Sequence, residues 1–120
     1  AHQIFCDYND VASLEAAAAE AGDDLAAIFA APFRHDAFID QAEPDPAYAA
    51  AARAVCDRAG ALLLVDGVRA GFRLSRDCSW SRIGVQPDLS TWGKCLANGH
   101  PLSAMLGNDK ARKAAASIYV

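Results

Sequence analysis

Short apolar runs alternate with helix-like segments along most of the chain. Capping residues and glycines predict three helices. The first is capped by Asn9 or Asp10 and runs to residue 21, and the second is capped by Asp45 and ends at Gly60. The third is capped by Asn108 or Asp109 and runs to about residue 117. Four apolar runs between them predict strands over 25–31, 61–65, 89–92 and 102–106. Residues 68–86 are mixed in character, and we expect a connector with at most one helical turn there.

This order of helices and strands predicts an α/β fold with a largely parallel sheet. The run 61–65 is apolar without alternation, which is typical of a strand covered on both faces, and 25–31 has the length of a fully buried strand. A sheet of four strands leaves open edges that a complete domain normally covers or extends. The pattern therefore indicates a piece of a larger domain.

Composition and charge narrow the possible partners. Apolar residues make up 53% of the chain, but 28 residues are alanine, so the core is thinner than the percentage suggests. The net charge is −4 and no Lys/Arg run occurs, so we expect neither a nucleic acid partner nor a membrane surface. The longest apolar stretch, 25–33, is far shorter than the roughly 20 residues of a membrane span. We expect a cytoplasmic protein.

The cysteines and histidines are dispersed. No C-x-x-C or H-x-x-x-H spacing occurs, so neither a zinc site nor a disulfide framework is predicted, and we expect no metal. Cys56 falls on the apolar stripe of the second helix, where a buried and inert thiol is expected.

Asp66 and Lys94 are the leading candidates for chemistry. Each follows a predicted strand, and ligands of such sheets bind beyond the carboxyl ends of the strands. A lysine amine can form a Schiff base with an aldehyde, and a nearby carboxylate can keep a heterocyclic nitrogen protonated. These are the two protein groups that a pyridoxal phosphate enzyme needs. A capping aspartate and a surface lysine explain the same residues equally well.

Several motifs in a fixed order extend this interpretation. They are an apolar strand ending in Asp66-Gly67-Val68, then Gly71-Phe72-Arg73, Pro87-Asp88-Leu89, Gly93-Lys94 and the turn Asn98-Gly99-His100-Pro101, preceded by Tyr8-Asn9-Asp10, Gly22-Asp23-Asp24 and a strand ending at Pro32. Together they cover nearly the whole chain. The sequence resembles the class III aminotransferases, most of all the branch around glutamate-1-semialdehyde aminomutase.

The resemblance implies a fold and a site. Residues 1–120 correspond to part of the pyridoxal phosphate-binding large domain of a fold type I transferase. By position, Lys94 is the Schiff-base lysine, Asp66 pairs with the pyridine nitrogen and Val68 packs on the cofactor ring. The implied reaction moves an amino group between an amine or amino acid and a carbonyl acceptor, by transamination or by internal transfer. The implied full-length parent is a homodimer.

The resemblance also indicates what this stretch lacks. The family's phosphate-binding segment and its small C-terminal domain have no counterpart in these residues. We therefore expect the isolated chain to bind pyridoxal phosphate poorly and to be inactive, because those parts supply charge-assisted contacts.

Two residues depart from the family pattern. Gly67 and Ala31 stand where the family usually has acidic residues, which suggests a divergent branch with altered substrate or weakened catalysis. The alternative is a non-catalytic α/β fragment or pseudoenzyme that serves packing or dimerisation. A nicotinamide dinucleotide domain is disfavoured because no G-x-G-x-x-G follows a predicted strand. Arg73 and Asp88 also match the family, but loop or helix pairing explains them equally well, and His100 is expected to be a turn residue.

Overall fold

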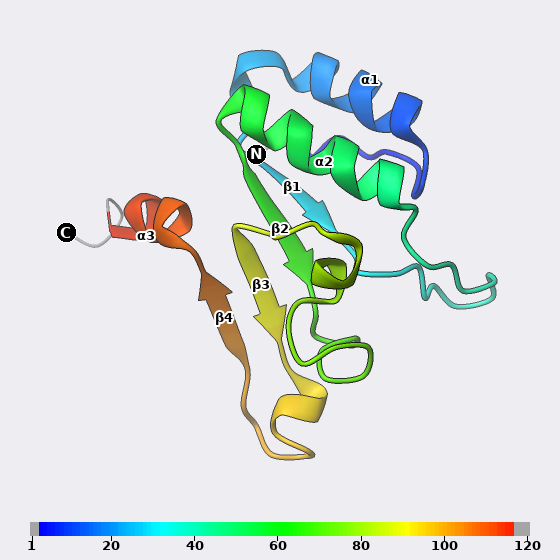
Figure 1. Ribbon diagram of the computed structural model, residues 1–120, viewed down its shortest axis with the longest axis vertical. Coiled ribbons are helices and arrows are strands. Elements are labelled where there is room, and N and C mark those ends of the chain that lie inside the picture. The colour runs from blue at the N-terminus through cyan, green and yellow to red at the C-terminus, as the bar shows by residue number, and fades with distance from the viewer. Residues whose placement is uncertain (1–2, 117–120) are drawn as a thin grey trace.

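The chain folds into a mixed sheet that is flanked by helices (Figure 1). The computed structural model describes residues 3–116. Within them the strands lie in the order β1-β2-β3-β4, with β1, β2 and β3 parallel and β4 antiparallel to β3. The elements are α1 (Val11–Ala21), β1 (Ala27–Ala30), α2 (Pro46–Ala59), β2 (Leu62–Asp66), β3 (Leu89–Trp92), β4 (Ala104–Gly107) and α3 (Asp109–Ala116). The predicted α/β fold with a mostly parallel sheet is confirmed.

The boundaries of α2 follow from local side-chain chemistry. The Asp45 carboxylate accepts a hydrogen bond from the Ala47 amide at 2.7 Å, and Pro46 occupies the first turn, where no amide partner is needed. Gly60 ends the helix with φ of 70°, a left-handed conformation that glycine adopts without steric cost. Both predicted ends of this helix are confirmed.

The core lies between α2 and one face of the sheet. Tyr48, Ala52 and Cys56 of α2 are buried together with Leu63 and Val65 of β2, and the burial predicted for Cys56 is confirmed. In Figure 1, α1 lies beside α2. The connector adds a fully buried indole, Trp80, from the short 3-10 helix Ser79–Ile83, and its Nε1 donates to the Pro32 carbonyl at 3.1 Å. The connector therefore completes the core and is tied to the end of β1.

The second face of the sheet is covered less than the apolar runs predict. Leu63 and Val65 are buried, but Leu62 and Leu64 are only half-buried, and Phe29 of β1 is 67% exposed. The two-sided burial expected for 61–65 and the full burial expected for 25–31 are therefore wrong for the described residues. The reason is that the core-forming side chains of α2 meet only the face that carries Leu63 and Val65.

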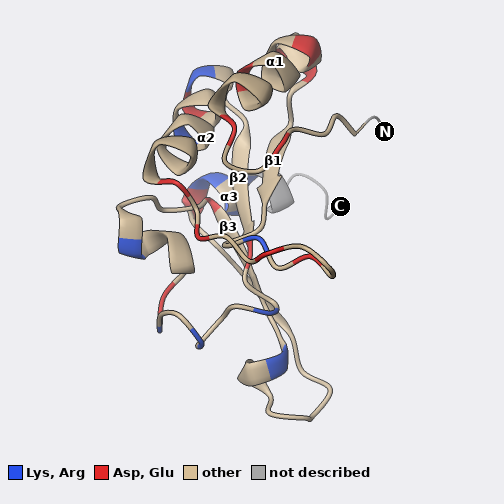
Figure 2. Cartoon of the chain, turned by 90° about the vertical axis from the view of Figure 1, so that its right-hand side faces the viewer, with Lys and Arg blue, Asp and Glu red and all other residues tan. Residues whose placement is uncertain are grey.

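Charged positions are distributed along the chain with both signs mixed (Figure 2). Within residues 3–116, every helix falls short of the length or the hydrophobicity that spanning a lipid bilayer requires. In the same residues, no group of three or more histidine, cysteine or acidic side chains is arranged to hold a metal ion.

Candidate functional site

Asp66 ends β2 at the carboxyl edge of the sheet, beside the end of β3. Its register partner on β3 is Thr91, whose hydroxyl donates to Asp66 Oδ1 at 2.6 Å. The Val68 amide donates to the same oxygen at 3.0 Å. Between residues 3 and 116 no hydrogen bond reaches Asp66 Oδ2. The carboxylate thus has one oxygen held by the fold and the other available.

Val68 packs against the turn that follows β3. A Cβ added at Gly93 would lie 3.2 Å from Val68 Cγ1, closer than most real side-chain contacts. The absence of a side chain at Gly93 therefore lets the segment after β2 approach the residue just before Lys94. Val68 itself is half-buried.

Gly67 occupies a still tighter space. A Cβ at this position would lie 2.7 Å from the Thr91 carbonyl oxygen, a distance that backbone atoms must shift to relieve. The Gly67 carbonyl also accepts a hydrogen bond from the Gly71 amide at 2.6 Å. An acidic side chain at residue 67 would therefore require the backbone around Thr91 to shift.

Lys94 begins the short 3-10 helix Lys94–Leu96 immediately after β3. Its side chain is exposed and makes no hydrogen bond or ion pair with any other residue in the described part of the chain. Its φ of 43° is in the left-handed region, which is uncommon for a residue with a side chain. The Lys94 carbonyl accepts from the amides of Ala97 at 3.2 Å and Asn98 at 2.9 Å, and these bonds hold the turn.

The structure therefore brings the three predicted site residues to one edge of the sheet. Asp66 and Val68 follow β2, and Lys94 follows the adjacent parallel strand β3. In Figure 1 the arrowheads of both strands point to the same end of the sheet. Asp66 and Lys94 therefore lie just beyond the carboxyl ends of two adjacent parallel strands, and their roles at this edge stay a prediction.

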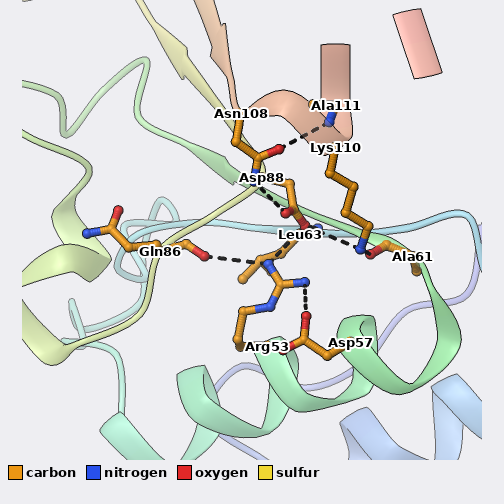
Figure 3. Close-up of polar contacts among 9 residues, drawn as sticks. All are labelled: Arg53, Asp57, Ala61, Leu63, Gln86, Asp88, Asn108, Lys110 and Ala111. Carbon is orange, nitrogen blue, oxygen red and sulfur yellow. Dashed lines mark hydrogen bonds and ion pairs between the residues drawn. The ribbon is translucent and has the colours of Figure 1, made fainter. Parts of the chain in front are cut away.

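Asp88 lies at the opposite edge, just before β3, where it joins several elements (Figure 3). Its Oδ2 accepts from the Arg53 guanidinium and the Leu63 amide, each at 2.9 Å, and its Oδ1 accepts from Asn108 at 2.8 Å. Burial by itself raises the pKa of Asp88, but the bonds from Leu63, Asn108 and Arg53 outweigh it and hold that pKa below its ordinary value. Pairing within the fold thus accounts for this residue.

The other family-matching residues are not drawn into such a network. Arg73, in the connector, and His100, in the turn before β4, are both exposed. Thr91 was not singled out from the sequence, although it contacts Asp66 directly. Side chains alternate between the two faces along β3, but this alternation points to Thr91 as a partner of Asp66 only when the register of β3 with β2 is known.

Comparison with known proteins decides the family. Residues 3–118 match the family described as aminotransferase class-III. The chain belongs to this family. It is therefore part of an enzyme family, as its motifs predicted.

Individual relatives agree with this assignment. The chain is 56% identical over 119 residues to the aminopentol aminotransferase of Sphingopyxis macrogoltabida, covering 99% of the chain and 28% of that relative. It is 32% identical over 115 residues to the glutamate-1-semialdehyde 2,1-aminomutase of Nitrosospira multiformis, covering 96% of the chain and 27% of that relative. This class III aminotransferase chain thus spans little more than a quarter of the length of either protein.

A solved structure shows the same fold with a cofactor. The FumI protein of Sphingopyxis sp. MTA144, in its PLP internal aldimine form, superposes with a TM-score of 0.93 at 56% identity, covering 98% of the chain and 28% of that protein. Pyridoxal phosphate is the cofactor of this family. The residues at this edge suit it, because within positions 3–116 Lys94 has no side-chain partner, Asp66 has one oxygen without a hydrogen bond, and Val68 offers an aliphatic side chain.

Proposed function

We propose that the chain is part of a pyridoxal phosphate-dependent enzyme that transfers an amino group from an amine to a carbonyl acceptor. The observation that carries this proposal is the common edge of β2 and β3, where Asp66 keeps one oxygen available and the Lys94 amine has no partner in the described residues. When bound, pyridoxal phosphate supplies an electron sink for the bonds around the amine carbon of the substrate.

Each of the three residues has a separate task. Lys94 would hold the cofactor covalently through its amine. When that amine is free again, it would move a proton between the substrate carbon and the cofactor carbon. Asp66 keeps a proton on the pyridine nitrogen through its available oxygen. Val68 packs on the ring and excludes water from that face.

Transamination of an aminopentol-type amine is the form of the reaction that we propose. The relative at 56% identity is named for that substrate and for transamination, whereas the relative named for internal amino transfer is 32% identical. The larger likeness supports transfer between two molecules over transfer within one.

The chain's length bears on what it can do alone. Because it spans 28% of its 56%-identical relative, we expect cofactor affinity and turnover to depend on sequence beyond these residues. The 120-residue chain by itself then binds pyridoxal phosphate weakly and is inactive. In the full-length parent, two copies form a homodimer in the cytoplasm.

A hybrid enzyme tests the proposal. It consists of the Sphingopyxis macrogoltabida aminotransferase with this chain in place of its own matching segment. After borohydride reduction, peptide mass spectrometry should find one pyridoxyl group on Lys94. Lys94→Ala should abolish the label, whereas Lys113→Ala, which changes an exposed lysine of α3, should not. Label on a different lysine, or none, would contradict the proposed role.

Turnover separates the enzyme from the non-catalytic alternative. The hybrid enzyme should convert aminopentol in the presence of a 2-oxo acid. A hybrid that carries the Lys94 label but shows no turnover would favour the pseudoenzyme. For the isolated 120-residue chain, a stoichiometric cofactor absorbance band that Lys94→Ala abolishes would contradict the expected weak binding.

A further inference from the structure

The hydrogen bond between Thr91 and Asp66 is the shortest side-chain contact at the candidate site. At 2.6 Å it lies in the range of a hydroxyl that donates to an ionised carboxylate, the kind of bond that is about twice as strong as a neutral one. It joins residues 25 positions apart, from two adjacent strands. It therefore forms only when β2 and β3 are paired in this register.

Thr91 is itself held closely on its backbone side. Its carbonyl oxygen lies against Gly67, where a Cβ would approach it to 2.7 Å. The same strand pairing that brings its hydroxyl to Asp66 therefore also holds the ends of β2 and β3 in close approach. The hydroxyl and the carboxylate meet in a fixed geometry.

Both hydrogen bonds to Asp66 reach the same oxygen. The Val68 amide and the Thr91 hydroxyl both donate to Oδ1, so two groups of the fold hold this oxygen. With Thr91 absent, one amide bond would remain, and the carboxylate could rotate about it.

We propose that Thr91 is a positioning residue that holds Oδ1 of Asp66, so that Oδ2 is presented to the pyridine nitrogen of bound pyridoxal phosphate. This inference rests on the proposed function and adds a residue to the same site. The hydroxyl acts through Asp66 and does not touch the reacting atoms.

Cofactor affinity in the hybrid enzyme tests this role. Thr91→Val removes the hydroxyl and keeps the branched shape and strand preference, and it should raise the Kd of pyridoxal phosphate about tenfold, the loss expected for one hydrogen bond to a charged group. Thr91→Ser keeps the hydroxyl and should stay within about twofold of the parent. Equal losses in the two variants would overturn the proposal. If Thr91→Val does not fold, Thr91→Ala replaces it in the same comparison.

A double substitution shows whether the effect passes through Asp66. In an Asp66→Ala background the hydroxyl has no carboxylate to hold, so adding Thr91→Val should leave the Kd unchanged. A further tenfold loss in that background would mean that Thr91 acts through strand packing, and it would refute the positioning role.

The state of the cofactor nitrogen gives a readout that strand packing alone does not move. With ¹⁵N at the pyridine position, the pH at which this nitrogen loses its proton should fall in Thr91→Val, because a rotating carboxylate faces it less often. An unchanged or higher pH would overturn the inference. The Lys94 label is measured on the same samples, so failure of the proposed function would appear separately as a missing label.

Discussion

The Arg53 guanidinium lies 2.9 Å from Asp88 Oδ2 and joins α2 to the residue that precedes β3. Asp88 is 5% exposed, and both of its oxygens are bonded, one of them also to the Leu63 amide. Asp66, at the other edge of the sheet, has a bond to only one oxygen in the described residues. Asp88 therefore stabilises the fold, whereas Asp66 keeps one oxygen available for the role proposed above.

Asp88→Asn should destabilise the fold. The substitution leaves the half-buried Arg53 without its buried charge partner, and breaking such a pair costs about 3 kcal/mol. Urea unfolding of the hybrid enzyme measures the change as a lower midpoint. Asp57→Asn is the matched control, because Asp57 also pairs with Arg53, at 2.8 Å, but its side chain is 63% exposed. Its loss should cost less than about 1 kcal/mol, and equal effects would contradict the importance of burial.

The lowered pKa of Asp88 predicts that the stability of the fold depends on pH. Its pKa in the folded chain is lower than its ordinary value of 3.8, so Asp88 contributes stability above that value and loses it as the pH falls through the folded pKa. The difference in midpoint between the parent and Asp88→Asn should therefore be full near pH 6 and should shrink below about pH 4. A difference that grows on acidification would show that the folded pKa is raised.

Gly67→Ala should disturb the site as well as the fold. The added Cβ would lie 2.7 Å from the Thr91 carbonyl, so the ends of β2 and β3 must move apart, at a cost of about 1–3 kcal/mol. Because Asp66 and Thr91 lie at that junction, the Kd of pyridoxal phosphate in the hybrid enzyme should rise as well. Gly60→Ala is the comparison: it has open space around it but a φ of 70°, so it should lower stability and leave the Kd unchanged.

Cysteine reactivity should differ sharply between two positions. Cys56 is fully buried in α2, and burial raises the pKa of its thiol, whereas Cys95 is exposed beside Lys94. Iodoacetamide should therefore modify Cys95 in the folded 120-residue chain within minutes and leave Cys56 unmodified until urea unfolds the protein. Peptide mass spectrometry over a time course measures both rates. Early modification of Cys56 would contradict the expected inert thiol.

Much of the fold was predictable because its signals are local. A cap such as Asp45 and a stop such as Gly60 act within one helical turn, so both ends of α2 can be located from a few neighbouring residues. The positions of Asp66 and Lys94 were also predictable, since the ends of parallel strands meet at one edge. The motifs around these residues then sufficed to indicate the family.

Other features of the fold and the site depend on contacts between residues far apart in the sequence, so the local sequence does not predict them. The one-sided burial of β2 results from where α2 packs, so the uniform run Leu62-Leu63-Leu64 does not reveal it. The bond from Thr91 to Asp66 and the crowding at Gly67 require the exact register of β2 with β3. The sequence by itself determined the order of elements and the residues at the strand ends, because caps, stops and apolar runs act over short stretches of chain. Only the tertiary structure decided which oxygen of Asp66 is held and which is available, because that depends on how two distant strands are aligned in space.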